Sequence, residues 1–433
     1  MPEPCWHRAG AAAERPAPPG GVVQGWVAPR PVRNGRGIGD KRSMRVPSWL
    51  PLLLGFLSAV GPVSTDMYLP AFPAIEATYG GIAGSAQITL ATWFAGLAVG
   101  QISQGVLADR FGRRRPLLAG MLLYTLASCG CALAPSLGVL ASLRFVEAIG
   151  GSAGMVLTRA IVRDVSEGLA AARMMSRLML IMGVAPILAP TIGGLILAVG
   201  DWHLIFWVCT AYGAIGTLAV ALLLPETLPE EARTRLSPGR QAARFGAILR
   251  ERGFLSHALM GSGTMFAMFA YLGGSPPVFI DLYHLAPPVY GMLFGTCAAA
   301  YIVGSQFNPA MLVRFGVRRV VRLATRSFLA VAVTLLVVAS LHPGAWYAIA
   351  IPLFCIMATQ GFIMPNATVG ALARHAQHAG SASALMGTMQ FVFASVSGLA
   401  VGLLADGTAR PMAVLMVAGG LLAMLCDLAR PRP

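Results

Sequence analysis

The sequence predicts an all-α integral membrane protein whose twelve transmembrane helices form two pseudo-symmetric bundles of six. Of its 433 residues, 56% are hydrophobic and 11% are charged, which is more apolar surface than one water-soluble core can bury. Apolar segments long enough to cross a hydrocarbon layer of about 30 Å recur along the chain. We place them near residues 49–70, 86–108, 116–134, 138–158, 178–199, 203–224, 254–275, 289–311, 324–341, 345–370, 382–404 and 411–428.

The basic residues predict the orientation of these spans. With the N-terminus inside, all 32 Lys and Arg residues except Arg144 and Arg410 fall on the inner side or in the terminal tails. This distribution follows the positive-inside rule. The net charge of +15 therefore reflects topology and lipid contact, and we expect no nucleic-acid partner. Both termini are expected in the cytoplasm.

Four parts follow one another along the chain. Residues 1–47 are rich in Pro, Gly, Ala and Arg without a helical or strand period, which is typical of a disordered tail. We hypothesise that Met44 is the true start. A cleaved signal peptide is the alternative for this basic tail, and the eleven further spans favour retention. The remaining parts are a six-helix bundle (48–224), a cytoplasmic linker (225–253) and a second six-helix bundle (254–433).

The first predicted helix contains an acid, Asp66, close to its expected outer end. At about 1.5 Å per residue it would lie about 6 Å from that end. One interpretation is an acid that faces water at the level of the headgroups. The other is a functional site, because intramembrane acids are costly and mark ion or substrate pathways.

The loop between the second and third helices has an ordered charge pattern. One acid and four arginines stand where two apolar segments meet the water. An ordinary basic loop would satisfy the orientation rule in any order. The pattern G-x-L-A-D-R-x-G-R-R is carried by Gly105, Leu107, Asp109, Arg110, Gly112, Arg113, Arg114 and Arg115.

The fourth helix contains Arg144, the single basic residue inside a predicted span, with Glu147 three residues later on the same face. By the same rise, Arg144 would lie about 9 Å below the outer surface, at a depth similar to Asp66. A structural salt bridge is one interpretation. A titratable acid held beside a fixed cation is the other, and the sequence does not choose between Asp66 and Glu147 as that acid.

The fifth helix combines two prolines with a pair of glycines. Pro186 and Pro190 each remove a backbone hydrogen bond and bend the helix, whereas Gly193 and Gly194 allow close packing. These residues alone predict a kinked, tightly packed helix.

The second half repeats the first faintly, with an offset that places Arg110-Phe-Gly112 on Arg314-Phe-Gly316. Asp66 has no acidic counterpart there. The half is rich in Met and aromatic residues, which suit packing more than a site. We name a set of candidates for a substrate cavity: Tyr68, Met265, Phe269, Gln360, Asn366 and Gln390. The seven cysteines are scattered, so we expect no disulfide framework, metal site or cofactor.

Three of these features resemble the major facilitator superfamily. The loop pattern matches the family signature between helices 2 and 3, and Arg144 and the run Ala189-Pro190-x-x-Gly193-Gly194 resemble its helix 4 and antiporter helix 5 motifs. Ala185 and Ala189 stand where the family has Gly. The segments 64–73 and 159–164 resemble the bicyclomycin and chloramphenicol resistance branch (Bcr/CflA type). Glu147 departs from the Gln that is usual there.

The resemblance implies a monomeric proton-coupled exporter of apolar or amphipathic drugs in a bacterial inner membrane. It places Asp66, Arg144 and Glu147 on the ligand path and makes the helix 2–3 loop a conformational gate, with Asp109 facing a helix N-terminus. The alternative within transport is an exporter of one metabolite, such as an amino acid or sugar. A membrane enzyme or receptor lacks support, because no nucleophile with a base and no metal-ligand spacing is present. A transporter that became a sensor is a further alternative.

Overall fold

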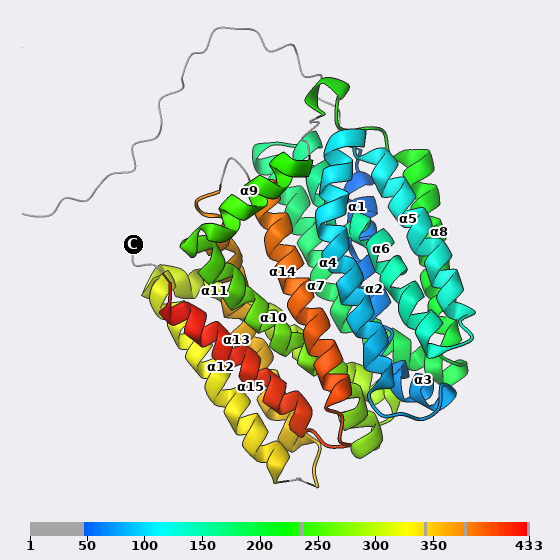
Figure 1. Cartoon of the computed structure of the whole chain (residues 1–433), viewed down its shortest axis with the longest axis vertical. Coiled ribbons are helices and arrows are strands. Elements are labelled where there is room, and N and C mark those ends of the chain that lie inside the picture. The colour runs from blue at the N-terminus through cyan, green and yellow to red at the C-terminus, as the bar shows by residue number, and fades with distance from the viewer. Residues whose placement is uncertain (1–46, 234–237, 342–343, 376–378, 431–433) are drawn as a thin grey trace, which may run out of the picture. The chain divides into compact units, whose positions relative to one another are not determined.

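Helices account for all regular structure that the computed structural model describes, which covers residues 47–233, 238–341, 344–375 and 379–430 (Figure 1). Twelve spans in these ranges are long and apolar enough to cross a membrane. They form the two six-helix bundles, so the predicted fold class is confirmed. The predicted tail, apart from Pro47, and Met44 lie outside the described residues.

The first bundle contains six spans, of which the first is built from four short pieces. The pieces are α1 (Leu50–Ser58), α2 (Val60–Thr65), η1 (Leu69–Ala71) and α3 (Phe72–Thr78). The other spans are α4 (Ser85–Phe111), α5 (Arg114–Ala132), α6 (Leu137–Val165), α7 (Gly168–Val199) and α8 (His203–Leu223).

The second bundle again contains six spans, and the linker before it contributes two shorter helices. The linker holds η2 (Glu230–Ala232) and α9 (Pro238–Arg250). The spans are α10 (Arg252–Pro276) with η3 (Pro277–Leu282), α11 (Pro287–Phe315), α12 (Val317–Ser340), α13 (Tyr347–Leu372), α14 (Ala379–Leu403) and α15 (Arg410–Leu428).

The broken first span corrects the expected position of Asp66. The chain leaves the α-helix after Thr65 and resumes at Phe72, with Pro70 in the interruption and Pro73 in the first turn of α3. Proline cannot donate a helical hydrogen bond, which favours a break before Pro70 and a helix start at Pro73. The whole span runs to Thr78 instead of residue 70. Asp66 therefore lies well before the end of the span and is buried inside the bundle, 6% exposed.

The duplicated turn predicted from the sequence has the same backbone in both halves. Gly112 has φ 88° and Gly316 has φ 75°, in the left-handed region that favours glycine. The arginine two residues before each glycine lies over the ring of the phenylalanine between them, at 5.3 Å for Arg110 and 5.2 Å for Arg314. The two halves thus share local structure at this position, although only the first copy has an acid there.

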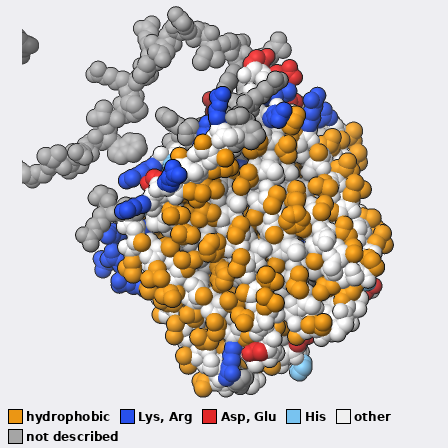
Figure 2. All heavy atoms as spheres, in the orientation of Figure 1, with side chains coloured by type: hydrophobic (Ala, Val, Ile, Leu, Met, Phe, Trp, Pro, Cys, Tyr) orange, Lys and Arg blue, Asp and Glu red, His pale blue; other side chains and the backbone are white. Residues whose placement is uncertain are grey.

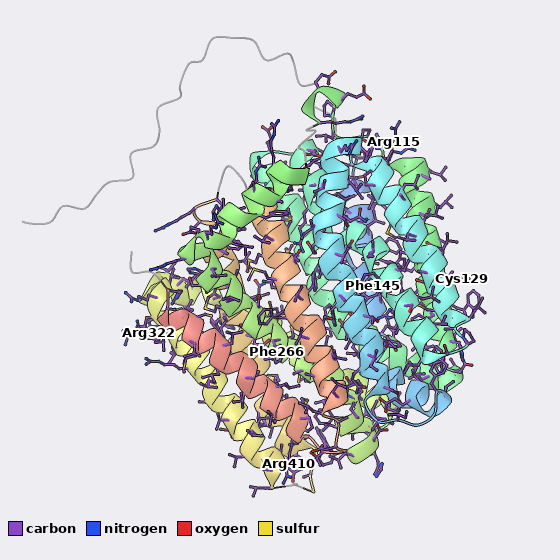
Figure 3. The ribbon with its side chains drawn as sticks, viewed as in Figure 1. Arg115, Cys129, Phe145, Phe266, Arg322 and Arg410 are labelled. Carbon is purple, nitrogen blue, oxygen red and sulfur yellow. The ribbon has the colours of Figure 1, made fainter. Side chains whose placement is uncertain are left out.

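The surface is divided into an apolar belt and a basic end. Figure 2 shows hydrophobic side chains around the middle and Lys and Arg side chains gathered at the top and upper left. Large apolar residues such as Leu180, Leu222 and Ile351 are exposed in this belt, as expected where lipid replaces water. In Figure 3, Arg115 and Arg410 lie at opposite ends. We call the end with Arg110–Arg115 the basic end and the end with Arg410 the opposite end.

The two bundles meet through α7 against α11 and α4 against α14. Near the opposite end, glycines bring the backbones into contact. A Cβ atom added at Gly194 would lie 2.7 Å from the carbonyl oxygen of Pro287, and one added at Gly291 would lie 2.7 Å from that of Pro190. The glycine–proline run of α7 therefore forms a close crossing between the two halves.

We predict that Gly194→Ala weakens this crossing, because the new methyl group meets a backbone atom that cannot rotate away. Thermal unfolding of the purified protein in detergent should show a loss of about 1–3 kcal/mol. Gly138→Ala, at a helical position with nothing within 4 Å of the added atom, is the matched control and should be neutral. Equal effects of the two substitutions would contradict the close crossing.

Candidate functional site

The centre of the first bundle holds a fully buried ion pair. Arg144 and Glu147, three residues apart on α6, both have 0% exposed side chains, and the Arg144 Nη1 to Glu147 Oε2 distance is 2.8 Å. Isolated charges are expensive in such a setting. The charge of each side chain therefore neutralises the charge of the other. Their spacing of three residues had placed both on one face of the helix.

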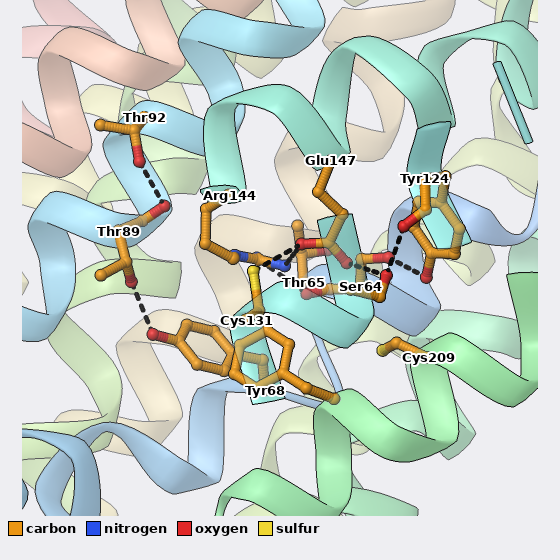
Figure 4. A network of polar contacts seen from close by, with 12 residues as sticks. Ser64, Thr65, Tyr68, Thr89, Thr92, Tyr124, Cys131, Arg144, Glu147 and Cys209 are labelled. Atoms are coloured by element: carbon orange, nitrogen blue, oxygen red, sulfur yellow. Dashed lines mark hydrogen bonds and ion pairs between the residues drawn. The ribbon is translucent and has the colours of Figure 1, made fainter. Parts of the chain in front are cut away.

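Arg144 is held in place by the broken first span and by aromatic rings (Figure 4). Its Nη2 donates to the carbonyl oxygen of Ser64 at 2.9 Å. The guanidinium carbon lies 4.4 Å from the centre of the Trp93 ring, 4.8 Å from Tyr68 and 5.6 Å from Phe206. Such contacts stabilise a desolvated cation. The pair thus connects α6 to three other spans.

Glu147 has further partners that use its remaining lone pairs. Ser128 Oγ donates to Oε1 at 2.8 Å, and Cys131 Sγ lies 3.8 Å from Oε2. Beside them, the hydroxyls of Ser64 and Tyr124 are 2.7 Å apart (Figure 4). Glu147 is consequently saturated by one cation and two donors on α5. Ser128 and Trp93 could not be predicted from the sequence, because these partners come from other spans.

Asp66 stands apart from this network. Its Oδ1 accepts a hydrogen bond from Thr65 Oγ1 at 3.0 Å, and it has no ion-pair partner among the described residues. The expectation that Arg144 lies beside a titratable acid is met by Glu147, whereas Arg144 reaches the backbone of Ser64, two residues before Asp66. Asp66 is therefore a buried carboxyl without a counter-charge.

Asp66 lines a cavity of about 210 Å³ between the two bundles. The walls are almost entirely apolar. They include Trp93, Phe94, Leu97, Met155, Pro186, Met268, Phe269, Tyr271, Phe294, Met357 and Phe391. Trp93 separates this cavity from Arg144, since its ring also covers the guanidinium. Within the lining, Asp66 is the only ionisable carboxyl group.

Of the cavity candidates from the sequence, Phe269 lines this space and the others do not. Tyr68 packs on Arg144, with its hydroxyl 2.5 Å from Thr89 Oγ1. Asn366 Nδ2 donates to Asn308 Oδ1 at 2.9 Å, which joins α13 to α11. These two residues hold helices together instead of facing the cavity.

The remaining candidates lie elsewhere in the second bundle. Gln390 Nε2 lies 3.9 Å from Met364 Sδ. Gln360 is fully buried, and neither amide atom has a hydrogen-bond partner among the described residues. Met265 is half-buried against the core. Sequence composition could not tell which polar or soft side chains on a buried helix face the interface between the bundles.

The loop at the basic end is organised by two carboxylates besides Asp109. Arg113 bridges Asp109 on α4 and Asp164 on α6, with both N–O distances 2.8 Å. Arg114 Nη2 donates to the carbonyl oxygen of Ala221 at 2.6 Å. Gly105 has open space around it. The signature loop thus links α4, α6 and α8 within the first bundle.

Glu226, directly after α8, accepts hydrogen bonds from the backbone N–H groups of Arg113 at 2.7 Å and Arg114 at 3.3 Å. This position at the start of α5 suits an anion. Asp109 itself pairs with Arg113 in this structure, and its expected place at a helix N-terminus when the cavity faces outward stays a prediction. A side chain at Gly112 would meet Glu226 Oε2 at 2.3 Å, which explains the glycine.

The surroundings of Glu226 shift the pKa of its carboxyl group. Burial raises its pKa, but the backbone N–H groups of Arg113, Leu228, Arg114 and Thr227 outweigh burial and bring the pKa below its usual 4.5. A carboxyl group with a lowered folded-state pKa stabilises the fold above its usual pKa and loses that contribution as the pH falls through the lowered value.

We predict that Glu226→Gln destabilises the protein at neutral pH by about 0.5–1 kcal/mol, since it weakens charged hydrogen bonds to the half-buried Arg113 and the exposed Arg114, and solvent screens a partly exposed carboxylate. The difference from wild type should vanish in acid below the lowered pKa. Thermal unfolding across pH measures it. Glu230→Gln, an acid with an 82% exposed side chain in the same linker, is the control. A Glu226 effect that is constant with pH would contradict the assignment.

A second prediction concerns the buried pair. Glu147→Leu leaves Arg144 without compensation and should cost about 3–5 kcal/mol of unfolding free energy. The double variant Arg144→Met with Glu147→Leu should recover part of this loss, because no charge remains buried. A double-mutant cycle by thermal unfolding measures the coupling. Additive effects would show that the two side chains do not compensate each other.

Comparison with known proteins supplies the family. The family described as Major Facilitator Superfamily matches residues 54–399. The uncharacterized MFS-type transporter YdgK of Bacillus subtilis (strain 168) is 37% identical over 85% of this chain and 91% of its own length. A bicyclomycin resistance protein homolog of Haemophilus influenzae is 30% identical over 86% of this chain and 94% of its own.

One solved structure shows the same fold. It is a bacterial homolog of the human lysosomal transporter Spinster, described in an inward-facing and occupied conformation. It covers 90% of this chain and 97% of its own, with a TM-score of 0.67 and 16% identity. At this identity the likeness concerns the fold alone.

Proposed function

We propose, from the premise that this chain belongs to the Major Facilitator Superfamily, that it is a proton-coupled drug exporter. Its substrates would be small apolar or amphipathic molecules similar to chloramphenicol or bicyclomycin. The observation that carries the proposal is the apolar cavity between the bundles with Asp66 as the one carboxyl group in its lining. The resistance protein among the relatives supports the substrate class.

The arrangement favours Asp66 over Glu147 as the proton carrier. Glu147 already has a cation at 2.8 Å and two further donors, so adding a proton would break the pair and leave Arg144 buried alone. Asp66 has one neighbouring hydroxyl and faces the cavity. A bound proton removes an expensive charge from an apolar space. In an antiporter, proton binding and drug binding would compete for this space, so that drug binding displaces the proton of Asp66.

Alternating access requires that protonation change the relative stability of two facing states. In this structure the halves touch closely near the opposite end and enclose a second cavity at the basic end. We propose that the basic end faces the cytoplasm of a bacterial inner membrane and that this is the inward-facing state. Residues 48–224 and 254–433 would then rock against each other as a functional monomer, with residues 225–253 as the linker.

The helix 2–3 loop would act as the gate in this cycle. In the present state its charges are satisfied within the first bundle and its linker, by Arg113 with Asp109 and Asp164 and by Glu226. Closure at the basic end would bring this loop against the second bundle. We propose the same gating role for the other residues of this loop, which are Gly105, Arg110, Gly112 and Arg114.

The test is drug-induced proton release from everted membrane vesicles. We expect a pH signal with chloramphenicol-like drugs in wild type and its loss in Asp66→Asn. Asp406→Asn removes an exposed carboxyl group near the opposite end and should keep the signal. Retained drug binding by Asp66→Asn would show that the variant folds.

Two outcomes would contradict this account. An unchanged signal in Asp66→Asn would remove Asp66 as the proton carrier. No signal in wild type over a broad drug panel would favour the alternative, a proton-driven exporter of one metabolite such as an amino acid or sugar.

A further inference from the structure

A second cavity, of about 370 Å³, lies at the basic end between the two bundles. Its walls come from α4, α6, α7, α9 and α14. They are unusually rich in hydrogen-bond donors. The polar side chains in the lining are Gln101, Asp109, Arg113, Arg159, Arg163, Gln241, Arg244, Ser381 and Ser383.

Three of the arginines in this cavity have no partner in the part of the chain that the structure describes. Arg159, Arg163 and Arg244 form no hydrogen bond or ion pair with any described residue. Arg113, in the same lining, is matched by Asp109 and Asp164. Asp109 is the only acid among the lining residues, and its carboxylate already forms an ion pair with Arg113. The cavity therefore carries an uncompensated positive charge.

Two of these arginines lie close together along one helix. Arg159 and Arg163 are one helical turn apart on α6, and like charges at this spacing destabilise a helix. Both have accessible side chains, although Arg159 lies more than one turn before the end of α6 and faces the cavity. Arg163 is in the last turn, where a cation is favoured by the helix dipole. That favourable position does not apply to Arg159 or to Arg244 on α9.

The opposite wall leaves room for a ligand. On α14 the lining residues are Gly380, Ser381, Ser383 and Ala384, which are small and offer hydroxyl donors. Gln101 and Gln241 add amide groups. A concave site with one sign of charge concentrates counter-ions, and the planar guanidinium fork matches the oxygens of a phosphate.

We propose that this cavity is a phosphate-binding site in which Arg159 and Arg163 hold the anion from α6 and Arg244 holds it from α9. The phosphate is either free inorganic phosphate or the headgroup of an anionic lipid. Because α9 joins the two bundles and packs on α10 and α14 (Figure 1), a bound anion connects α6 of the first bundle to the linker. It therefore stabilises the state in which this cavity is open, independently of the substrate.

The experiment uses the full chain in nanodiscs of phosphatidylcholine. Inorganic phosphate is titrated at constant ionic strength against chloride, and the thermal unfolding midpoint is recorded, since a ligand that binds the folded state raises it. We expect a saturable increase in wild type. Arg159→Gln and Arg244→Gln should weaken the apparent affinity at least about tenfold, given about 1.4 kcal/mol or more for a charged hydrogen bond. Arg318→Gln, exposed and outside the cavity, should not.

A second arm distinguishes the source of the phosphate. If free phosphate has no saturable effect but phosphatidylglycerol in the nanodisc stabilises wild type and not Arg159→Gln, the ligand is a lipid headgroup. Arg159→Lys, which keeps the charge and loses the fork, should fall between wild type and Arg159→Gln. No effect of either phosphate source, or equal effects in wild type, Arg159→Gln and Arg244→Gln, would overturn the proposal. Neither arm depends on drug transport.

Discussion

The rest of the structure depends on how one buried cation, Arg144, is compensated inside the membrane. A lone guanidinium at this position would be among the most expensive groups in the bundle. Glu147 neutralises it, and the Ser64 carbonyl and a ring of aromatic side chains solvate it. The break in the first span brings Ser64 and Asp66 to this depth. Compensation of Arg144 by Glu147 leaves Asp66 as the free carboxyl group of the central cavity.

The two ends of the interface between the bundles have opposite character. Near the opposite end, small residues allow backbones of α7 and α11 to touch, so the contact is short and apolar. At the basic end, arginines, glutamines and serines surround an open space. Apolar backbone contacts are stable without water, whereas a charged space favours hydration or an anion. The two ends of the interface thus differ in both packing and charge.

Much of this architecture could be predicted from the sequence. Hydropathy gave the twelve spans, and spacing on a helix gave the Arg144–Glu147 pair, because both are local properties. Contacts between distant segments could not be derived. The hydrogen bonds from Arg113 to Glu226 join residues 113 positions apart, and α9 lies in a stretch regarded only as a linker. Asp66 was expected near the outer end because the predicted first segment ended at residue 70, whereas the chain returns to an α-helix at Phe72 and the span runs to Thr78.

We propose that Asp66, and not Glu147, exchanges its proton while Arg144 stays paired. Infrared difference spectroscopy of the protein in lipid, recorded between acid and alkaline pH, measures protonated carboxyl groups directly. The account predicts a carboxylic acid band that disappears as the pH rises, is absent in Asp66→Asn and persists when Arg144 and Glu147 are both replaced by glutamine. A band that survives Asp66→Asn and is lost in that double variant would contradict it.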